Sequence, residues 1–377
     1  MTQRKQRESN LELLRIVAMV LIIIHHIVVH CVQPELENSQ LIAHFDNGYF
    51  GQPALYGQLF LVEFFNPLGK AGVAIFMLIS GYFLTERGND IKIGKIAGKL
   101  LGHIAFVTVL LTLAVSVYNL ASGKTVLIPD TDFYTNNWWF VGYYFAVVFI
   151  GRYWLCGWLN RLSKEAYGGL LLALAGLFCF QWIRLLLSFS LVIPTLIAGL
   201  FMFALGGYIR KFDPFKKIPS AVLILAFVLL CAWVMLNYRN VTMNAIAQYA
   251  QEEMEDAFTP PAVAWSEYHI LPILQGLLLF ELFRRIRLRG NRVINFLAGA
   301  SFMVYLVHDV EFVRGIWKQV DFITPLWENP LLFLLDLLKW AAIIYAAGVL
   351  AYVCYSALAR WFRRLLPSCS SQSPGSR

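Results

Sequence analysis

The sequence predicts an all-α integral membrane protein of about ten transmembrane helices, with both termini in the cytoplasm. Hydrophobic residues make up 59% of the 377-residue chain and charged residues 14%, whereas a soluble domain has about 45–50% apolar and about 25% charged residues. The apolar residues gather in long runs, as membrane-spanning helices require. Short clusters of Lys and Arg separate these runs, in the manner of orientation signals.

Ten runs are apolar and close to or above the roughly 17 residues that a spanning helix needs. The eighth is the weakest, because Pro272, Gln275 and Glu281 lie inside it. The predicted spans are residues 13–32, 66–84, 97–120, 138–158, 166–184, 190–209, 219–237, 268–284, 293–312 and 331–358.

The positive charges support this count. With the N-terminus in the cytoplasm, the inner segments hold 22 of the 31 Lys and Arg residues and the outer loops hold five. Dropping one span would reverse every later loop and destroy this asymmetry. We therefore expect residues 1–360 to form a single membrane-embedded bundle. Residues 361–377 should form a cytoplasmic tail whose Ser-rich end is disordered.

Several classes of protein are excluded by pattern. The net charge of +8 does not indicate nucleic-acid binding, because the cations are spread between the spans. The six cysteines have neither zinc-ligand spacing nor a disulfide framework, and we expect no metal site. Phosphate-binding glycine loops, zinc-protease helices and nucleophile elbows are not found in the sequence. The first apolar run lacks a cleavage site, so we expect it to remain as the first span.

The first span contains ionisable residues, which are costly inside a bilayer and often mark function. Arg15 and His26 are eleven residues apart, which places them on one helix face about 16 Å apart along the axis. The His26 imidazole suits proton transfer from an acceptor hydroxyl. Arg15 could bind donor phosphates or a partner carboxylate. The alternative is a snorkelling Arg15, with His25 and His26 as structural helix contacts.

Two further segments carry polar groups beside small or aromatic residues. Lys70 and Ser80 lie in the second span, where the lysine could bind a polar acceptor or anchor the interface and the serine could bond across helices. The fourth span begins with Asn136-Asn137-Trp138-Trp139-Phe140. Trp139 could belong to an aromatic platform for a sugar or lipid-linked acceptor, or to an ordinary interfacial belt.

A late cluster lies in the ninth span. Ser301, Tyr305 and His308 have i, i+4, i+7 spacing, which places them on one helix face. Glu311 would be a helical neighbour of His308 and could orient its ring. The alternative is an interfacial polar cluster without a catalytic role.

In order along the chain, these segments resemble the acyltransferase-3 family of bacterial integral-membrane carbohydrate O-acyltransferases. Arg15 and His26 match the family's Arg-x10-His motif, which selects His26 over His25. The second span matches around Gly72-Val73 and at Ser80-Gly81-Tyr82-Phe83-Leu84, and the late match is Ser301 to His308. Position 74 is Ala, where many relatives have a polar residue or proline.

The resemblance implies a bacterial inner-membrane enzyme that moves an acyl group, acetyl above all, from cytoplasmic acetyl-CoA (acyl-CoA) to a hydroxyl of a cell-surface or lipid-linked glycan. His26, Arg15 and His308 would be the catalytic residues. Acetyl-CoA would be a co-substrate and not a permanently bound cofactor. Two alternatives stay open: a glycolipid flippase or polysaccharide transporter that uses the same cations, and a scaffold for polysaccharide export. The substrate-binding side chains would be His25, Lys70, Ser80, Trp139, Tyr305 and Glu311.

Overall fold

A computed structural model describes residues 8–34, 60–123, 138–179, 192–251 and 269–365. All regular elements in these ranges are helices, which confirms the all-α prediction. The elements are α1 (Ser9–Ile27), η1 (Val28–Val32), α5 (Phe60–Leu84), η3 (Thr85–Asp90), α6 (Ile93–Ser122), α8 (Trp139–Ile150), η4 (Gly151–Leu155), α9 (Cys156–Leu159), α10 (Lys164–Cys179), α11 (Val192–Phe212), α12 (Ser220–Gln251), α13 (Ile270–Arg284), α14 (Arg292–His308), α15 (Glu311–Trp317), α16 (Ile323–Glu328) and α17 (Pro330–Leu365).

The helices form a multi-pass membrane bundle. Among the described residues, seven helices are long and apolar enough to cross a bilayer, and the bent pair of α14 and α15 brings the number to eight. The predicted fifth and eighth spans coincide with α10 and α13, whose described lengths are 16 and 15 residues. Ten spans and cytoplasmic termini stay predictions. The last helix runs to Leu365, past the predicted start of the tail.

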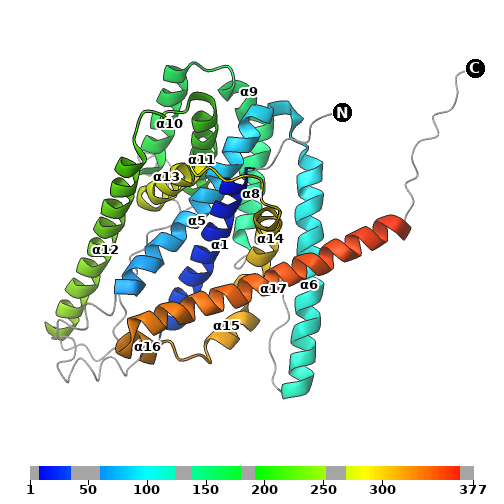
Figure 1. The fold of residues 1–377 in the computed structure, drawn as a ribbon, viewed down its shortest axis with the longest axis vertical. Helices are drawn as coiled ribbons and strands as arrows, with labels where there is room; N and C mark the ends of the chain where they lie inside the picture. The colour runs from blue at the N-terminus through cyan, green and yellow to red at the C-terminus, as the bar shows by residue number, and fades with distance from the viewer. Residues whose placement is uncertain (1–7, 35–59, 124–137, 180–191, 252–268, 366–377) are drawn as a thin grey trace, which may run out of the picture.

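The helices α1 and α5 lie at the centre of the bundle, between α11, α13, α14 and α17 (Figure 1). The close contacts of α5 with α1 and with α11 depend on glycines. A Cβ at Gly69 would lie 2.2 Å from the Cβ of His25, and one at Gly81 would lie 1.8 Å from the Phe203 carbonyl oxygen. Small residues of this kind let transmembrane backbones pack in direct contact. The Ser80-Gly81 segment therefore has a packing role at Gly81.

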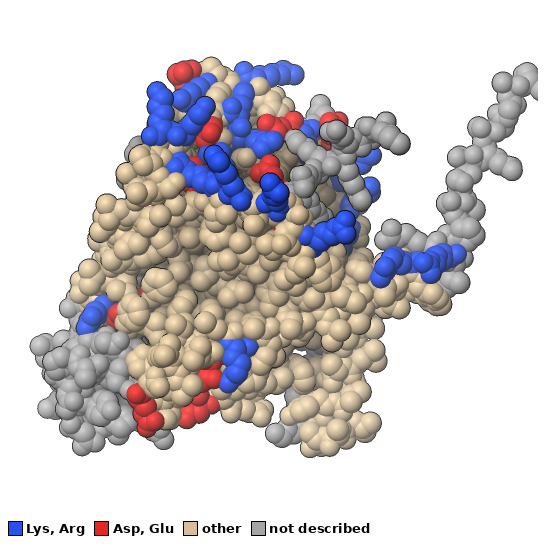
Figure 2. Space-filling view, in the orientation of Figure 1, with Lys and Arg blue, Asp and Glu red and all other residues tan. Residues whose placement is uncertain are grey.

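Charged side chains are separated along the long axis of the molecule. In Figure 2 most Lys and Arg gather at one end, above a broad band free of charged side chains. Acidic side chains appear at both ends of the same view, and only a few Lys and Arg lie toward the opposite end. An uncharged band between polar ends is what a bilayer core requires. The positive-inside rule would place the cationic end in the cytoplasm.

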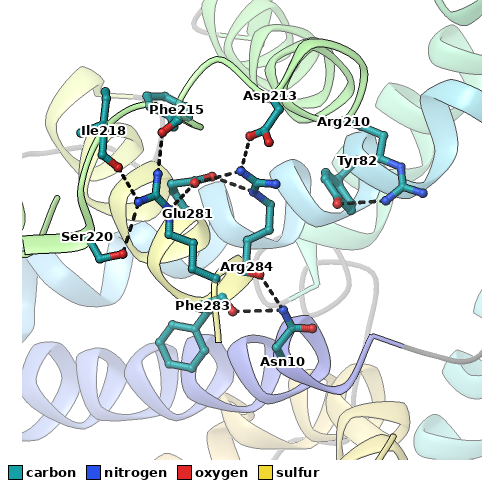
Figure 3. A network of polar contacts seen from close by, with 11 residues as sticks. Asn10, Tyr82, Arg210, Asp213, Phe215, Ile218, Ser220, Glu281, Phe283 and Arg284 are labelled. Atoms are coloured by element: carbon teal, nitrogen blue, oxygen red, sulfur yellow. Dashed lines mark hydrogen bonds and ion pairs between the residues drawn. The ribbon is translucent and has the colours of Figure 1, made fainter. Parts of the chain in front are cut away.

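A buried ionic network closes the cationic end of α13 (Figure 3). Glu281 is 1% exposed and accepts hydrogen bonds from Arg284 Nε and Arg285 Nε, both at 2.7 Å. Arg284 also pairs with Asp213 in the connection between α11 and α12. Asn10 Nδ2 donates to the carbonyl oxygens of Phe283 and Arg284 at 3.1 and 3.0 Å. These bonds satisfy carbonyls that the end of a helix leaves without partners.

Candidate active site

A cavity of about 820 Å³ runs between α1, α5, α6, α8 and α14. Its lining is mostly apolar and aromatic, as is usual for small-molecule sites. Within the described chain, every charged residue that lines it is a Lys or an Arg. These residues are Arg15, Lys70, Arg87, Lys95 and Lys99. The lumen therefore favours an anionic ligand.

Arg15 and His26, which the sequence places on one face of the first helix, both line this cavity. Arg15 Nη1 also pairs with the buried Glu12, one turn earlier on α1, at 3.1 Å. Arg15 therefore does have a carboxylate partner, one of the two roles considered for it. Because the guanidinium presents five donors, the ion pair through Nη1 is compatible with an additional anionic ligand.

At the other end of the site, His26 belongs to a cluster around Asp309. The His26 Nδ1 lies 3.0 Å from Asp309 Oδ2, and the His30 Nε2 lies 3.3 Å from Asp309 Oδ1. Arg314 binds the same carboxylate with both ends of its guanidinium. Its Nε and Nη2 donate to Oδ1 and Oδ2 at 2.7 and 2.8 Å. One carboxylate thus holds two imidazoles and one guanidinium.

Two local irregularities place these side chains together. The chain changes from α-helix to π-helix after Ile27, and His30 lies within the π-helical turn Val28–Val32. The His26 and His30 rings stack there at 5.4 Å between centroids. The helix α14 ends at His308, and α15 leaves at 82° after Asp309 and Val310. Single π-helical turns often occur at functional sites because they reorient side chains.

The hydrogen-bond partners determine which nitrogen of each ring carries the proton. A carboxylate only accepts, so a neutral His26 donates from Nδ1 and keeps its lone pair on Nε2. The carbonyl oxygen of Tyr305 lies 2.6 Å from His308 Nδ1, which likewise leaves the lone pair of His308 on Nε2. This Nε2 is buried without a hydrogen-bond partner in the described structure. The rings of His26 and His308 meet edge to face at 4.9 Å.

Most of the predicted contact residues line the same cavity: His25, Lys70, Ser80, Trp139 and Tyr305. Two of them also have structural bonds. Ser80 Oγ donates to the Phe76 carbonyl oxygen at 2.7 Å, within its own helix. The Tyr305 hydroxyl accepts from the Phe140 amide at 3.2 Å and thereby caps the first turn of α8. Asn136 and Asn137 lie outside the described residues. Contact of these side chains with a substrate stays a prediction.

The expectation that Glu311 and His308 are neighbours on one helix is wrong. The helix ends at His308, and Glu311 is an exposed residue that begins α15. The sequence pattern does not show the bend, since neither proline nor glycine lies between them. The carboxylate that contacts a site histidine is that of Asp309, and the histidine is His26. A contact between Glu311 and a substrate stays a prediction.

The donor atoms of His26, His308 and Asp309 lie within 4.8 Å of one another, close enough to bind one metal ion. However, Arg314 already engages both oxygens of Asp309. Because the Arg314 guanidinium neutralises the Asp309 carboxylate, we interpret this carboxylate as a partner of the histidine rings and not as a metal ligand. The cationic lumen is better suited to an anionic co-substrate.

Sequence reasoning missed several residues of the site. His30 is four residues after His26, a spacing that places two rings on one helix face. Asp309 follows His308 directly, but a continuous helix favours Glu311 instead. Lys95 and Lys99 fit the pattern of orientation signals, although they also line the cavity.

Comparison with known proteins identifies the family of the chain. A family model described as an acyltransferase domain matches residues 8–360. The chain belongs to this family, acyltransferase-3, and is a membrane acyltransferase. No curated protein and no solved structure gives a significant match.

Proposed function

We propose that this protein is a bacterial inner-membrane O-acyltransferase that transfers an acyl group, preferentially acetyl, from cytoplasmic acyl-CoA to a hydroxyl of a cell-surface or lipid-linked glycan. The observation that carries the proposal is a single lumen with cations along it and the imidazole of His26 in its wall. An anionic thioester donor and a basic nitrogen are the two components that acyl transfer to a hydroxyl needs.

We place the donor beside Arg15 and Lys95, two of the cations that line the lumen. CoA carries several phosphate groups, which Lys and Arg side chains bind by charge-assisted hydrogen bonds. Arg15 and His26 are eleven residues apart on one helix, about 16 Å along its axis. Phosphates held near Arg15 therefore allow the extended arm of the donor to carry its thioester toward His26.

The reaction follows from the position of the lone pair on His26. Nε2 takes the proton of the acceptor hydroxyl while the hydroxyl oxygen attacks the thioester carbonyl carbon. The carbon–sulfur bond of the resulting tetrahedral adduct then breaks, the leaving thiolate takes the proton from His26, and the acylated glycan and free CoA are released. Asp309 Oδ2, at 3.0 Å from Nδ1, stabilises the transient imidazolium. His308 is buried outside the lining of the described cavity, so it would help to position the acceptor through the His26 ring, which its own ring meets edge to face.

Labelled acetyl-CoA tests the proposal in membranes that contain the protein. Wild type should transfer label to glycan, and His26→Ala should lose about 10²–10⁴-fold in rate, the usual contribution of a general base. His269→Asn is the matched control and should behave like wild type, because it changes an exposed histidine but keeps a side-chain acceptor for the Leu271 amide at the start of α13.

Two outcomes would contradict the proposal. If wild type moves glycolipid across the membrane without acylating it, the protein is a transporter that uses its cations to bind anionic head groups. If His26→Ala, Arg15→Ala and His308→Ala all acylate at the wild-type rate, the lumen is not the reaction site. Competition by succinyl-CoA in the same assay measures the preference for acetyl.

A further inference from the structure

Asp309 is buried and Arg314 half-buried close to the His26 ring. The reaction scheme uses Asp309 only against His26 and does not explain why Arg314 and His30 bind the same carboxylate. Asp309 is 7% exposed. Its oxygens each receive one bond from Arg314 and one from an imidazole of α1 or η1. A carboxylate this deep in a helix bundle is costly unless it is fully paired.

We infer that Asp309 and Arg314 are positioning residues that act through His26, with His30 as the second ring on the same carboxylate. This inference rests on the proposed function, because it assigns the partners of the proposed base. In this arrangement Arg314 fixes the orientation of the Asp309 carboxylate group. The carboxylate then fixes the proton of His26 on Nδ1 and the basic lone pair on Nε2.

The bidentate geometry explains why an arginine is needed. Arg314 approaches through Nε and Nη2, so two parallel bonds fix both the place and the rotation of the Asp309 carboxylate. A lysine offers a point charge and cannot set that rotation. The 82° bend between α14 and α15 lets residues five apart meet in this way. On a straight helix they would face different directions.

His30 adds a second ring to the pair formed by His26 and Asp309. Its Nε2 lies 3.3 Å from both Asp309 Oδ1 and His26 Nδ1. With a proton on His30 Nε2, two N–H groups converge on one carboxylate, and neither ring can rotate without losing a charge-assisted bond. Removing the carboxylate would release both rings, and His26 could then place its proton on Nε2, the nitrogen that must stay basic.

Asp309→Asn is the test, because an amide keeps the size of the side chain but offers one acceptor oxygen. We expect kcat to fall about 100-fold or more, while the KM for acetyl-CoA stays within about twofold because binding is not removed. In a His26→Ala background, Asp309→Asn should have no further effect, since a residue that acts through another gives non-additive losses. Asp336→Asn on α17, which breaks a pair with Lys339, is the matched control.

Arg314 provides the second variant if Asp309→Asn lowers the yield of folded protein. Arg314→Gln should reduce kcat about 10–100-fold, a loss typical of groups that orient the residues of a site, and Arg314→Lys should restore only part of it. Full kcat in Asp309→Asn or Arg314→Gln, beside an inactive His26→Ala, would overturn the inference and leave the proposed function intact. Absence of acyl transfer in wild type would instead overturn the proposed function.

A spectroscopic readout tests the positioning independently of transfer. In protein labelled with ¹⁵N-histidine, the difference between wild type and His26→Gln isolates the two ring nitrogens of residue 26. We expect an unprotonated Nε2 in wild type and a mixture of tautomers in Asp309→Asn. The same Nδ1 and Nε2 signals in both proteins would contradict the role of the carboxylate.

Discussion

Gly81 provides a direct test of how closely α5 packs on α11. A Cβ at this position would lie 1.8 Å from the Phe203 carbonyl oxygen and 2.6 Å from its carbonyl carbon, whereas real Cβ contacts under 3.0 Å are essentially unknown. The obstacle is helix backbone, which cannot rotate away as a side chain can. In Gly81→Ala the two helices must therefore separate by more than an ångström.

The energetic cost follows from this separation. Overpacking of a well-packed interior costs typically about 1–3 kcal/mol, and more where the backbone must move. We expect Gly81→Ala to reach at least the upper part of that range. The same contact is also tight from the side of α11, because a Cβ at Gly206 would lie 2.2 Å from the Leu78 carbonyl oxygen on α5.

Thermal unfolding in detergent measures this effect, with Gly98→Ala as the matched control. Gly98 is on α6, and a Cβ added there would meet no atom of the described residues within 4 Å. Alanine at this position should therefore be neutral or should stabilise the helix by up to about 1 kcal/mol. We expect a lower unfolding temperature for Gly81→Ala alone. If both variants unfold at the wild-type temperature and with the same yield, the close α5–α11 contact is refuted.

Three further substitutions test the cavity and the buried polar contacts that hold the helices around it. Lys95→Ala removes a lumen cation and should raise the KM for acetyl-CoA about tenfold, the loss of one charged hydrogen bond, in steady-state kinetics at low salt. Glu281→Ala leaves two half-buried guanidinium groups without their shared partner and should cost roughly 3 kcal/mol, seen as a lower unfolding temperature. Trp138→Phe deletes the buried 3.0 Å bond from Nε1 to the Leu306 carbonyl oxygen and should cost about 1–3 kcal/mol, measured in the same way.

Each change has a control of the same chemical type. Lys217→Ala alters an exposed lysine away from the cavity, and an equal rise in KM there would show a general charge effect. Glu86→Ala removes an exposed carboxylate from its pair with the half-buried Arg210, which should matter little. Trp361→Phe alters an exposed indole. Unfolding temperatures that do not separate Glu281→Ala and Trp138→Phe from these controls would contradict the assigned bonds.

Much of the fold could be predicted from local pattern. The apolar runs identify the helices because a bilayer leaves no alternative for backbone hydrogen bonds. The spacing of Arg15 and His26 gives their common face because helical geometry is regular. Residues that line the cavity beside them, including Lys70, Trp139 and Tyr305, can also be picked out from the sequence, since polar and aromatic residues are conspicuous in apolar runs.

Local pattern could not identify the carboxylate of the site. On a continuous helix the i, i+3 spacing favours Glu311 over Asp309 as the partner of His308, but α14 ends at His308 and α15 leaves at 82°. The pairing of Asp309 with His26 joins segments at opposite ends of the chain. Only the folded chain brings such residues together.

The amino-acid order therefore determines that this chain crosses a membrane and which helix carries the ionisable residues, because both depend on interactions within a few turns. Tertiary structure decides which cations share the lumen and which carboxylate holds the His26 ring. Those choices depend on the close contact of α1 with α5 and on where α14 ends, and they are made by packing between segments distant in sequence.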